Sequence, residues 1–115
     1  MKRVILESPY RGSGRWPFSM FHRCANIRYA RACIRDSLMR GESPIASHLL
    51  YTQPGILRDS DPEERRMGIE AGLAWRGVAE LHVFYIDRGT SEGMRAALKM
   101  SHQYEIRRLG KGNCP

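Results

Sequence analysis

The chain has 115 residues, of which 42% are hydrophobic and 27% are charged, and its formal net charge is +7. This length suits one domain and excludes two of ordinary size, and the composition is that of a globular protein rather than a disordered one. The positive charge favours anionic partners such as phosphates. Because no run of Lys or Arg exceeds two residues, the charge pattern does not favour a nucleic acid as the partner.

The three cysteines, Cys24, Cys33 and Cys114, fit neither a disulfide framework nor a tetrahedral metal site. Their number is odd, and no CxxC or HxxxH pair accompanies them. We therefore expect no metal and no cofactor. No apolar stretch approaches the ~18 residues of a membrane span, and the first residues run into a strand pattern instead of a signal peptide. These features predict a cytoplasmic protein with no membrane partner.

Strand patterns alternate with helical patterns along the chain. Short apolar runs predict strands at 4–6, 44–51, 81–86 and 104–109. Apolar residues at three-to-four spacing predict helices at 24–40, 61–75 and 91–102. This alternation predicts an α/β fold: a small Rossmann-like three-layer domain with about four mainly parallel strands and helices on both faces.

The other segments are predicted to be irregular. Residues 11–22 hold two glycines and Pro17 without periodicity, which is typical of a loop that could act as a lid. The polar tail at 110–115 is expected to be flexible. The chain, 1–115, is therefore interpreted as one Rossmann-like domain with a loop insertion at 11–23.

The helix predicted at 24–40 has an apolar stripe, expected to face the core, and a basic ridge, expected to face solvent. The apolar stripe consists of Ile27, Ala30, Ile34 and Leu38, and the basic ridge consists of Arg28, Arg31 and Arg35. The helix predicted at 61–75 opens with Asp61 as a cap and Glu64 at capping-box spacing. In it, Gly68 and Gly72 form a flat strip that suits close packing on the sheet or on another subunit.

In a parallel sheet with helices on both faces, ligands bind outside the carboxyl ends of the strands. Three segments follow predicted strands and supply the candidate ligand-binding residues. These are Glu7, Ser8, Tyr10, Arg11, Ser47, His48, Gln53, Asp87, Gly89, Thr90, Ser91, Gly93 and Met94.

The segment from Asp87 to Met94 joins a strand to a helix, and free N–H groups at a helix N-terminus attract anions. Gly89 and Gly93 would let a phosphate or ribose approach the backbone. The alternative is an ordinary tight turn with Thr90 or Ser91 as the helix cap.

Two further residues have alternative interpretations. Glu7 ends the first strand and could accept hydrogen bonds from ribose hydroxyls, or could pair with one of the arginines. His48 lies near a strand end, but a lone histidine is more typical of a structural position than of a catalyst.

Four blocks of the chain resemble a family of uncharacterised small proteins from bacteriophages and prophages. The matching blocks are Glu7–Tyr10, Asn26–Gly55, Asp61–Trp75 and Asp87–Leu98. The resemblance covers about residues 3–109. More distantly, the pattern is similar to the nucleoside 2-deoxyribosyltransferase and lonely-guy phosphoribohydrolase superfamily, which implies a ligand that is a nucleoside or nucleotide.

That superfamily often uses a glutamate in a G-T-x-x-E pattern as nucleophile or catalytic acid. With Gly89 and Thr90 as the turn, the glutamate position holds Gly93, and with Gly93 opening the turn it holds Ala97. Glu92 lies one residue earlier and would point about 100° away on a helix. The resemblance therefore implies binding more than turnover.

Three functions follow as hypotheses. The first is a nucleotide- or nucleoside-binding phage protein in the host cytoplasm, which could sequester a nucleotide signal of host defence and is expected to form a homo-oligomer. The second is an enzyme that cleaves or transfers at an N-glycosidic bond, with Glu7, Glu70 or Glu92 as the carboxylate. The third is a nucleic-acid-binding or assembly protein that uses its arginines.

Overall fold

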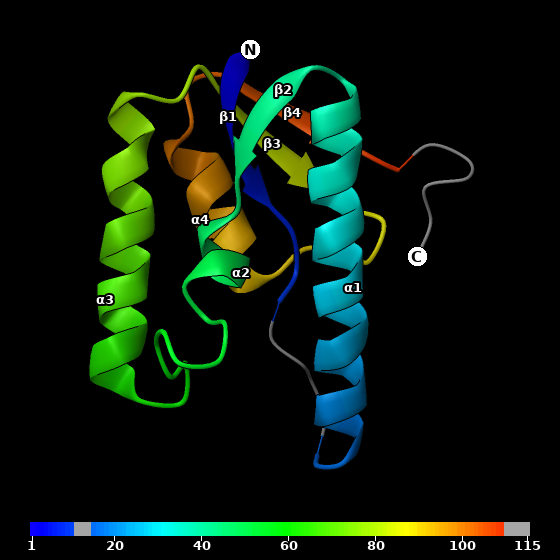
Figure 1. The fold of residues 1–115 in the computed structure, drawn as a ribbon, viewed down its shortest axis with the longest axis vertical. Coiled ribbons are helices and arrows are strands. Elements are labelled where there is room, and N and C mark those ends of the chain that lie inside the picture. The colour runs from blue at the N-terminus through cyan, green and yellow to red at the C-terminus, as the bar shows by residue number, and fades with distance from the viewer. Residues whose placement is uncertain (11–14, 110–115) are drawn as a thin grey trace.

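The structure is a computed structural model that describes residues 1–10 and 15–109. Figure 1 shows how its helices and strands alternate. In chain order they are β1 (Lys2–Glu7), α1 (Phe18–Met39), β2 (Glu42–Ile45), α2 (Ser47–Leu50), α3 (Pro62–Leu73), the 3₁₀ turn η1 (Ala74–Gly77), β3 (Leu81–Tyr85), α4 (Glu92–Met100) and β4 (Tyr104–Arg107). None of the helices in the described ranges combines the length and apolar character needed to span a bilayer.

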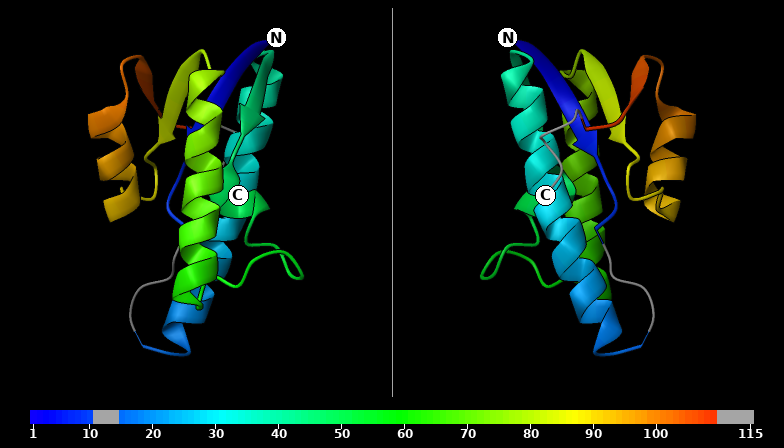
Figure 2. Two further views of the ribbon diagram at one scale, coloured as in Figure 1. Left: turned by 90° about the vertical axis from the view of Figure 1, so that its left-hand side faces the viewer. Right: turned by 90° about the vertical axis from the view of Figure 1, so that its right-hand side faces the viewer.

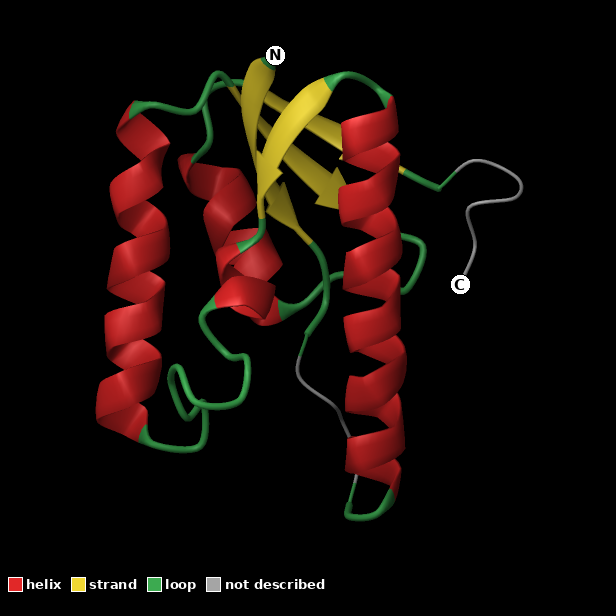
Figure 3. Cartoon of the chain, viewed as in Figure 1, coloured by secondary structure: helices red, strands yellow, loops and turns green. Residues whose placement is uncertain are grey.

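All four strands are parallel and lie in the order β2-β1-β3-β4. Right-handed crossovers therefore place α1, which joins β1 to β2, on one face of the sheet. They place α3 and α4, which lead back across the sheet, on the opposite face. Figures 2 and 3 show these three layers, and the predicted Rossmann-like α/β fold is confirmed.

The main core lies between α1 and the sheet. Val4 and Leu6 of β1 and Val83 of β3 point to this face, where Tyr29 and Cys33 of α1 cover them. All five side chains are at most 1% exposed. Full burial of a large apolar side chain contributes about 1.5–3 kcal/mol, so this layer holds α1 on the sheet.

The second strand is shorter than its apolar run predicts. β2 ends at Ile45, and Ser47–Leu50 forms the single helical turn α2, so the predicted strand at 44–51 is wrong beyond residue 45. Periodicity cannot distinguish a strand from a buried helical turn in so short a run. The turn lets Leu49 point into the core while Leu50 faces solvent.

The first helix begins earlier than predicted. α1 starts at Phe18, so the loop predicted at 11–22 and the insertion at 11–23 are wrong for residues 18–23. Pro17 precedes the first helical residue, and proline is tolerated there because the first N–H groups of a helix lack intrahelical partners. The rest of the predicted lid, residues 11–14, and the tail at 110–115 lie outside the described residues.

The buried face of α1 is also rotated from the predicted stripe. Leu38 faces solvent and Ile34 is only partly buried, whereas Tyr29 and Asp36 are buried. Both of these polar side chains have hydrogen-bond partners inside the protein, which removes most of the cost of burying them. A stripe drawn from apolar residues alone omits such positions.

The start of α3 is partly as predicted. Asp61 caps the helix by accepting a hydrogen bond from the Glu63 N–H at 3.0 Å. The predicted capping box is wrong, because the Glu64 carboxylate accepts a hydrogen bond from the backbone N–H of Arg58 instead, at 3.1 Å. The glycine strip of α3 does pack closely, but against α2 rather than the sheet: a Cβ on Gly72 would lie 2.5 Å from Ser47 Oγ.

A buried ion pair links the two outermost strands beneath α1. Arg107 of β4 donates two hydrogen bonds to Glu42 of β2, at 2.7 and 2.6 Å. Ser37 of α1 donates to the same carboxylate at 2.7 Å, and Tyr85 donates to Asp36 of α1 at 2.6 Å. Hydrogen bonds from Arg107 hold the pKa of Glu42 below its usual value, so the pair is ionised at neutral pH.

We expect Glu42→Gln to lower the free energy of unfolding by about 1–3 kcal/mol, because Arg107 would lose the more buried of its two carboxylate partners and keep only Glu105, which lies 2.9 Å from its Nε. Urea unfolding followed by circular dichroism measures the loss. Glu80→Gln is the matched control, since its ion pair with Arg3 at 3.6 Å is exposed and such pairs contribute about 0–1 kcal/mol. Equal losses in the two variants would contradict the role of the buried pair.

We expect Gly72→Ala to cost about 1–3 kcal/mol, because the added methyl group would overlap Ser47 and push α3 away from α2. Gly77→Ala is the control, since a Cβ there meets no heavy atom within 4 Å. Thermal unfolding compares the two variants. Wild-type stability in Gly72→Ala would mean that α3 does not rest on α2 through this glycine.

Candidate functional site

The carboxyl edge of the sheet is the part of the molecule where the candidate residues gather. α1 and α3 run antiparallel to the strands, so their N-terminal halves extend past this edge (Figure 1). Glu7 ends β1, α2 follows β2, and Asp87 follows β3. The chain therefore brings together, at one edge, segments that are up to 80 residues apart, from Glu7 to Asp87.

Glu7 is the most unusual of these residues. It pairs in register with Phe84 of β3, and it points to the face opposite α1. Burial raises the pKa of its carboxyl group to about 7, and the positive charge of Arg76 opposes this rise. Within residues 1–10 and 15–109, no hydrogen bond or close ion pair involves this carboxyl group.

Ser8 and His48 form a hydrogen-bonded pair that joins β1 to α2. Ser8 Oγ lies 2.8 Å from His48 Nε2, and burial lowers the pKa of His48 to about 4, so the ring is neutral at pH 7. A serine and a histidine at this distance resemble a nucleophile and its base. Ser8 is only 3% exposed, however, so the pair serves the fold, as expected for a lone histidine.

One polar atom of this pair has no partner in the described residues. His48 Nδ1 is buried and makes no hydrogen bond. When Ser8 accepts from Nε2–H, the orphaned Nδ1 is a lone pair rather than an N–H group, which is the less costly arrangement.

Tyr10 and Arg23 extend the edge toward the projecting half of α1. The Tyr10 and His48 rings pack edge to face, with centroids 6.1 Å apart. The Arg23 guanidinium lies over the Tyr10 ring, 5.8 Å from its centroid. These contacts form a continuous path from the end of β1 to the N-terminal half of α1.

A groove of about 610 Å³ lies at the end of this path. One wall comes from α1 and the segment before it, and the other from the segment that precedes α3. Its lining residues are Trp16, Ser19, Met20, Arg23, Cys24, Ile27, Asp59 and Ser60. The volume suits a drug-sized or nucleotide-sized ligand. The sequence prediction missed these residues, because only the packing of α1 beside residues 59–60 brings them together.

Asp87, by contrast, is fully engaged in holding the fold. Its carboxylate accepts hydrogen bonds from Tyr29 Oη at 2.6 Å and from the Leu109 N–H at 3.0 Å. Tyr29 Oη in turn accepts from the Asp87 N–H at 2.8 Å. Burial and the Asp87 hydrogen bond raise the pKa of Tyr29. Asp87 therefore fastens α1 and the end of β4 to the turn after β3.

The turn that follows Asp87 is also held by hydrogen bonds between its own residues and the start of α4. Ser91 caps α4 through its hydroxyl, which accepts from the Met94 N–H at 3.1 Å. Arg95 donates to the Thr90 side chain at 3.1 Å. Gly89 has φ +86°, a conformation that favours glycine. The capped-turn alternative therefore accounts for Thr90, Ser91 and the buried Met94 without a ligand.

The remaining predicted residues divide into structural and exposed ones. Gln53 donates its amide to the Leu49 carbonyl at 2.8 Å, and Ser47 lies under Gly72. Glu70 is exposed and lies 3.7 Å from Arg66, and Glu92 and Gly93 are exposed at the start of α4. Arg11 lies outside the described residues. Of the three candidate catalytic carboxylates, Glu7 is the one that is partly buried, and the other two are exposed.

Metal chemistry has no support from side-chain placement in the described part of the chain. No group of three or more His, Cys, Asp or Glu residues is arranged there to hold an ion. Cys24 is exposed and Cys33 is buried, and both are free thiols. Burial raises the pKa of the Cys33 thiol to about 12, so it stays protonated and unreactive.

Comparison with known proteins places the chain in a family. A family model described as "Domain of unknown function (DUF7768)" matches residues 2–109, and the chain belongs to this family. No curated protein matches the sequence, and no solved structure matches it.

Glu7 should make stability depend on pH. Between pH 4.5 and about 7, the folded protein keeps a proton on Glu7 that the unfolded chain has released. The native state is therefore destabilised by this group as pH rises through that window. We expect Glu7→Gln to gain stability over wild type across it, reaching on the order of 3 kcal/mol at the upper end.

Urea unfolding at a series of pH values measures this difference. Glu92→Gln is the control, because its side chain is exposed at the start of α4, and its difference from wild type should stay flat. If the Glu7→Gln difference is also flat across the window, Glu7 titrates normally and the carboxyl group is not desolvated.

Proposed function

We propose that this member of the DUF7768 family binds a nucleotide or nucleoside at the carboxyl edge of its sheet. The observation that carries the proposal is Glu7, a partly buried carboxyl group at the end of a central strand with no hydrogen-bond partner in the described residues. Burying a polar group without a partner is costly, and ribose hydroxyls or the N–H groups of a base would supply the missing donors.

The position of Glu7 supports a ligand of this class. β1 and β3 are neighbours, and the chain leaves them toward opposite faces, to α1 and α4. Such a switch point is where doubly wound α/β folds bind their ligands.

The groove beyond the same carboxyl edge of the sheet supports the rest of the ligand. Trp16 and Ile27 offer apolar surface for a flat ring, and Arg23 offers a cation for a phosphate. The contacts of Arg23 with Tyr10, and of Tyr10 with His48, connect this groove to the end of β1. A bound nucleotide that is kept intact would suit sequestration of a nucleotide signal.

A second candidate is cleavage or transfer at an N-glycosidic bond. The specific observation in its favour is again Glu7, because a carboxyl group with a pKa of about 7 can exchange a proton at neutral pH. In this role Glu7 would act as the acid for the leaving base or as the nucleophile at the anomeric carbon.

A thermal-shift screen against nucleosides and nucleotides tests both candidates. A ligand at about 100 times its Kd should add about 2.7 kcal/mol of apparent stability. We expect Glu7→Gln to weaken binding of the hit by roughly 10-fold or more, which corresponds to the loss of a hydrogen bond to a charged group. Glu92→Gln should bind as wild type does.

Chromatography of the hit after incubation separates the two candidates. Recovery of the intact ligand supports a binding protein, whereas release of a free base supports the glycosidic enzyme. If no nucleoside or nucleotide stabilises the protein, or if Glu92→Gln weakens binding as much as Glu7→Gln, the proposal fails.

A further inference from the structure

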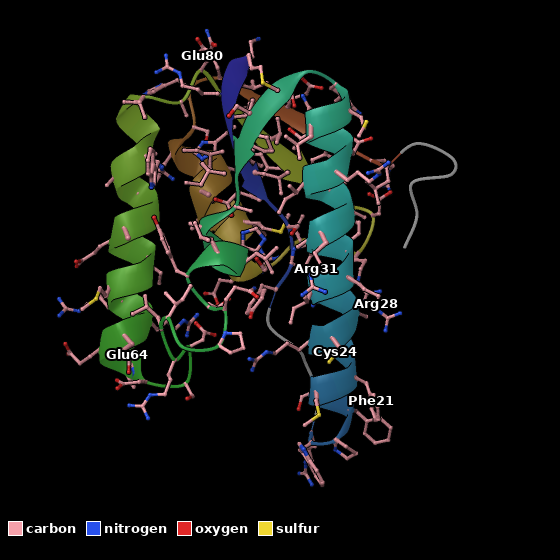
Figure 4. All side chains as sticks on the ribbon, in the orientation of Figure 1. Phe21, Cys24, Arg28, Arg31, Glu64 and Glu80 are labelled. Atoms are coloured by element: carbon pink, nitrogen blue, oxygen red, sulfur yellow. The ribbon has the colours of Figure 1, made fainter. Side chains whose placement is uncertain are left out.

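The solvent-facing side of α1 carries a surface that the edge site does not use. Residues at alternating spacings of three and four lie on one side of a helix, and on α1 this side faces away from the sheet. We call it the outer face of α1. It consists of Phe21, Arg28, Arg31, Arg35 and Leu38, all of them exposed, and Cys24 on the same side of the helix lines the groove instead. Figure 4 shows Phe21 and Arg28 pointing away from the body of the molecule.

The outer face is strongly and uniformly basic. Residues 15–35 contain five arginines and no Asp or Glu. In the described part of the chain, Arg28, Arg31 and Arg35 make no ion pair within 4.0 Å. Asp36, the first acidic residue of α1, is buried and accepts hydrogen bonds from Tyr85 and Arg40. The three arginines thus remain available to an anionic partner.

Large apolar side chains flank the arginines. Phe18 and Phe21, at the projecting end of α1, are 72% and 68% exposed, and Leu38, at the other end, is 47% exposed. The groove accounts for Trp16 and Met20 but not for these three residues. Contiguous exposed apolar surface marks interaction sites, and Phe18 and Phe21 lie together at the projecting end of α1, next to the arginines.

The shape of this surface decides between anionic partners. The outer face is the convex side of a single helix, and the grooves found in the described residues lie elsewhere. Single-stranded nucleic acids bind in basic grooves that follow the strand. Packing against the same face of a second copy would bring like-charged arginines together. The major groove of a DNA duplex admits a helix but offers no apolar interior to Phe18 and Phe21, which are 72% and 68% exposed. An anionic bilayer offers phosphates to the arginines and an apolar interior to these two side chains.

We propose that the outer face of α1 docks on the surface of an anionic lipid bilayer. Arg28, Arg31 and Arg35 lie on phosphate headgroups, and Phe21 of this face, with Phe18 beside it at the projecting end of α1, inserts at the boundary between headgroups and acyl chains. This proposal departs from the sequence prediction of no membrane partner, because that prediction rested on the length of apolar runs, which identifies spanning helices and not peripheral ones. The proposal is independent of the nucleotide site.

Vesicle co-sedimentation tests this proposal with the full chain. Wild type should bind phosphatidylcholine vesicles that contain phosphatidylserine, and should not bind pure phosphatidylcholine vesicles. Replacing Arg28, Arg31 and Arg35 together by Gln should weaken binding about 100-fold, since each arginine near the surface contributes about fivefold. Phe18→Ser with Phe21→Ser should also weaken binding, while the arginines remain.

The matched control replaces Arg65, Arg66 and Lys99 by Gln, three exposed cations outside α1. It removes the same charge and should keep most of the affinity, and circular dichroism verifies that each variant is folded. Absence of wild-type binding to anionic vesicles overturns the proposal, as does an equal loss in the control. Arginine-dependent binding to a single-stranded oligonucleotide but not to vesicles assigns the face to nucleic acid instead, and loss of self-association in the phenylalanine variant assigns it to a second copy.

Discussion

The ion pair between Glu42 and Arg107 connects the two edge strands of the sheet, with β1 and β3 lying between them. A buried charge without its partner is unfavourable by several kcal/mol, so the positions of β2 and β4 are not independent. α1 takes part through Ser37, which donates to Glu42, and through Asp36, which accepts from Tyr85. The pair therefore couples the positions of the edge strands to the position of α1. Because α1 forms one wall of the groove, the groove depends on the same contacts.

The two acidic residues at the ends of the neighbouring strands β1 and β3 show how the site differs from the core. Asp87 accepts hydrogen bonds from Tyr29 and Leu109, and every part of its role is structural. Glu7 is held in a partly buried position with no such donors in the described residues. Across residues 1–10 and 15–109, the fold supplies hydrogen-bond partners to Asp87 and to the Glu42–Arg107 pair, but none to Glu7. This difference supports a functional role for Glu7, and we propose that a ligand supplies its hydrogen-bond donors.

α1 serves several parts of the molecule at once because it is longer than the strands it covers. Its C-terminal half packs on the sheet through Tyr29 and Cys33, whereas its N-terminal half extends past the carboxyl edge (Figure 1). The extension supplies Arg23 to the groove, and the outer face supplies the arginines that we assign to a bilayer. Starting the helix at Phe18 rather than at residue 24 thus brings Arg23 to the groove and adds Phe21 to the outer face.

The sequence by itself determined the fold class and the edge of the sheet at which the candidate residues lie. Alternating strand and helix patterns require parallel pairing and right-handed crossovers, and this places Glu7, Ser8 and His48 at the carboxyl edge. Local chemistry also sufficed for Asp61, because an N-cap depends on backbone groups two residues away. The strands β1 and β3 could also be predicted from the local sequence, because burial on both faces of the sheet leaves a continuous apolar run.

Tertiary structure decided which polar residues serve the fold and which remain open to a ligand. Glu7 and Asp87 look alike in sequence, and the difference between them depends on Tyr29 and Leu109, which reach Asp87 from distant parts of the chain. The groove likewise depends on residues 59–60 lying beside α1. Hydrogen-bond satisfaction and cavities are properties of segments brought together in space, so no local pattern around a single residue can reveal them.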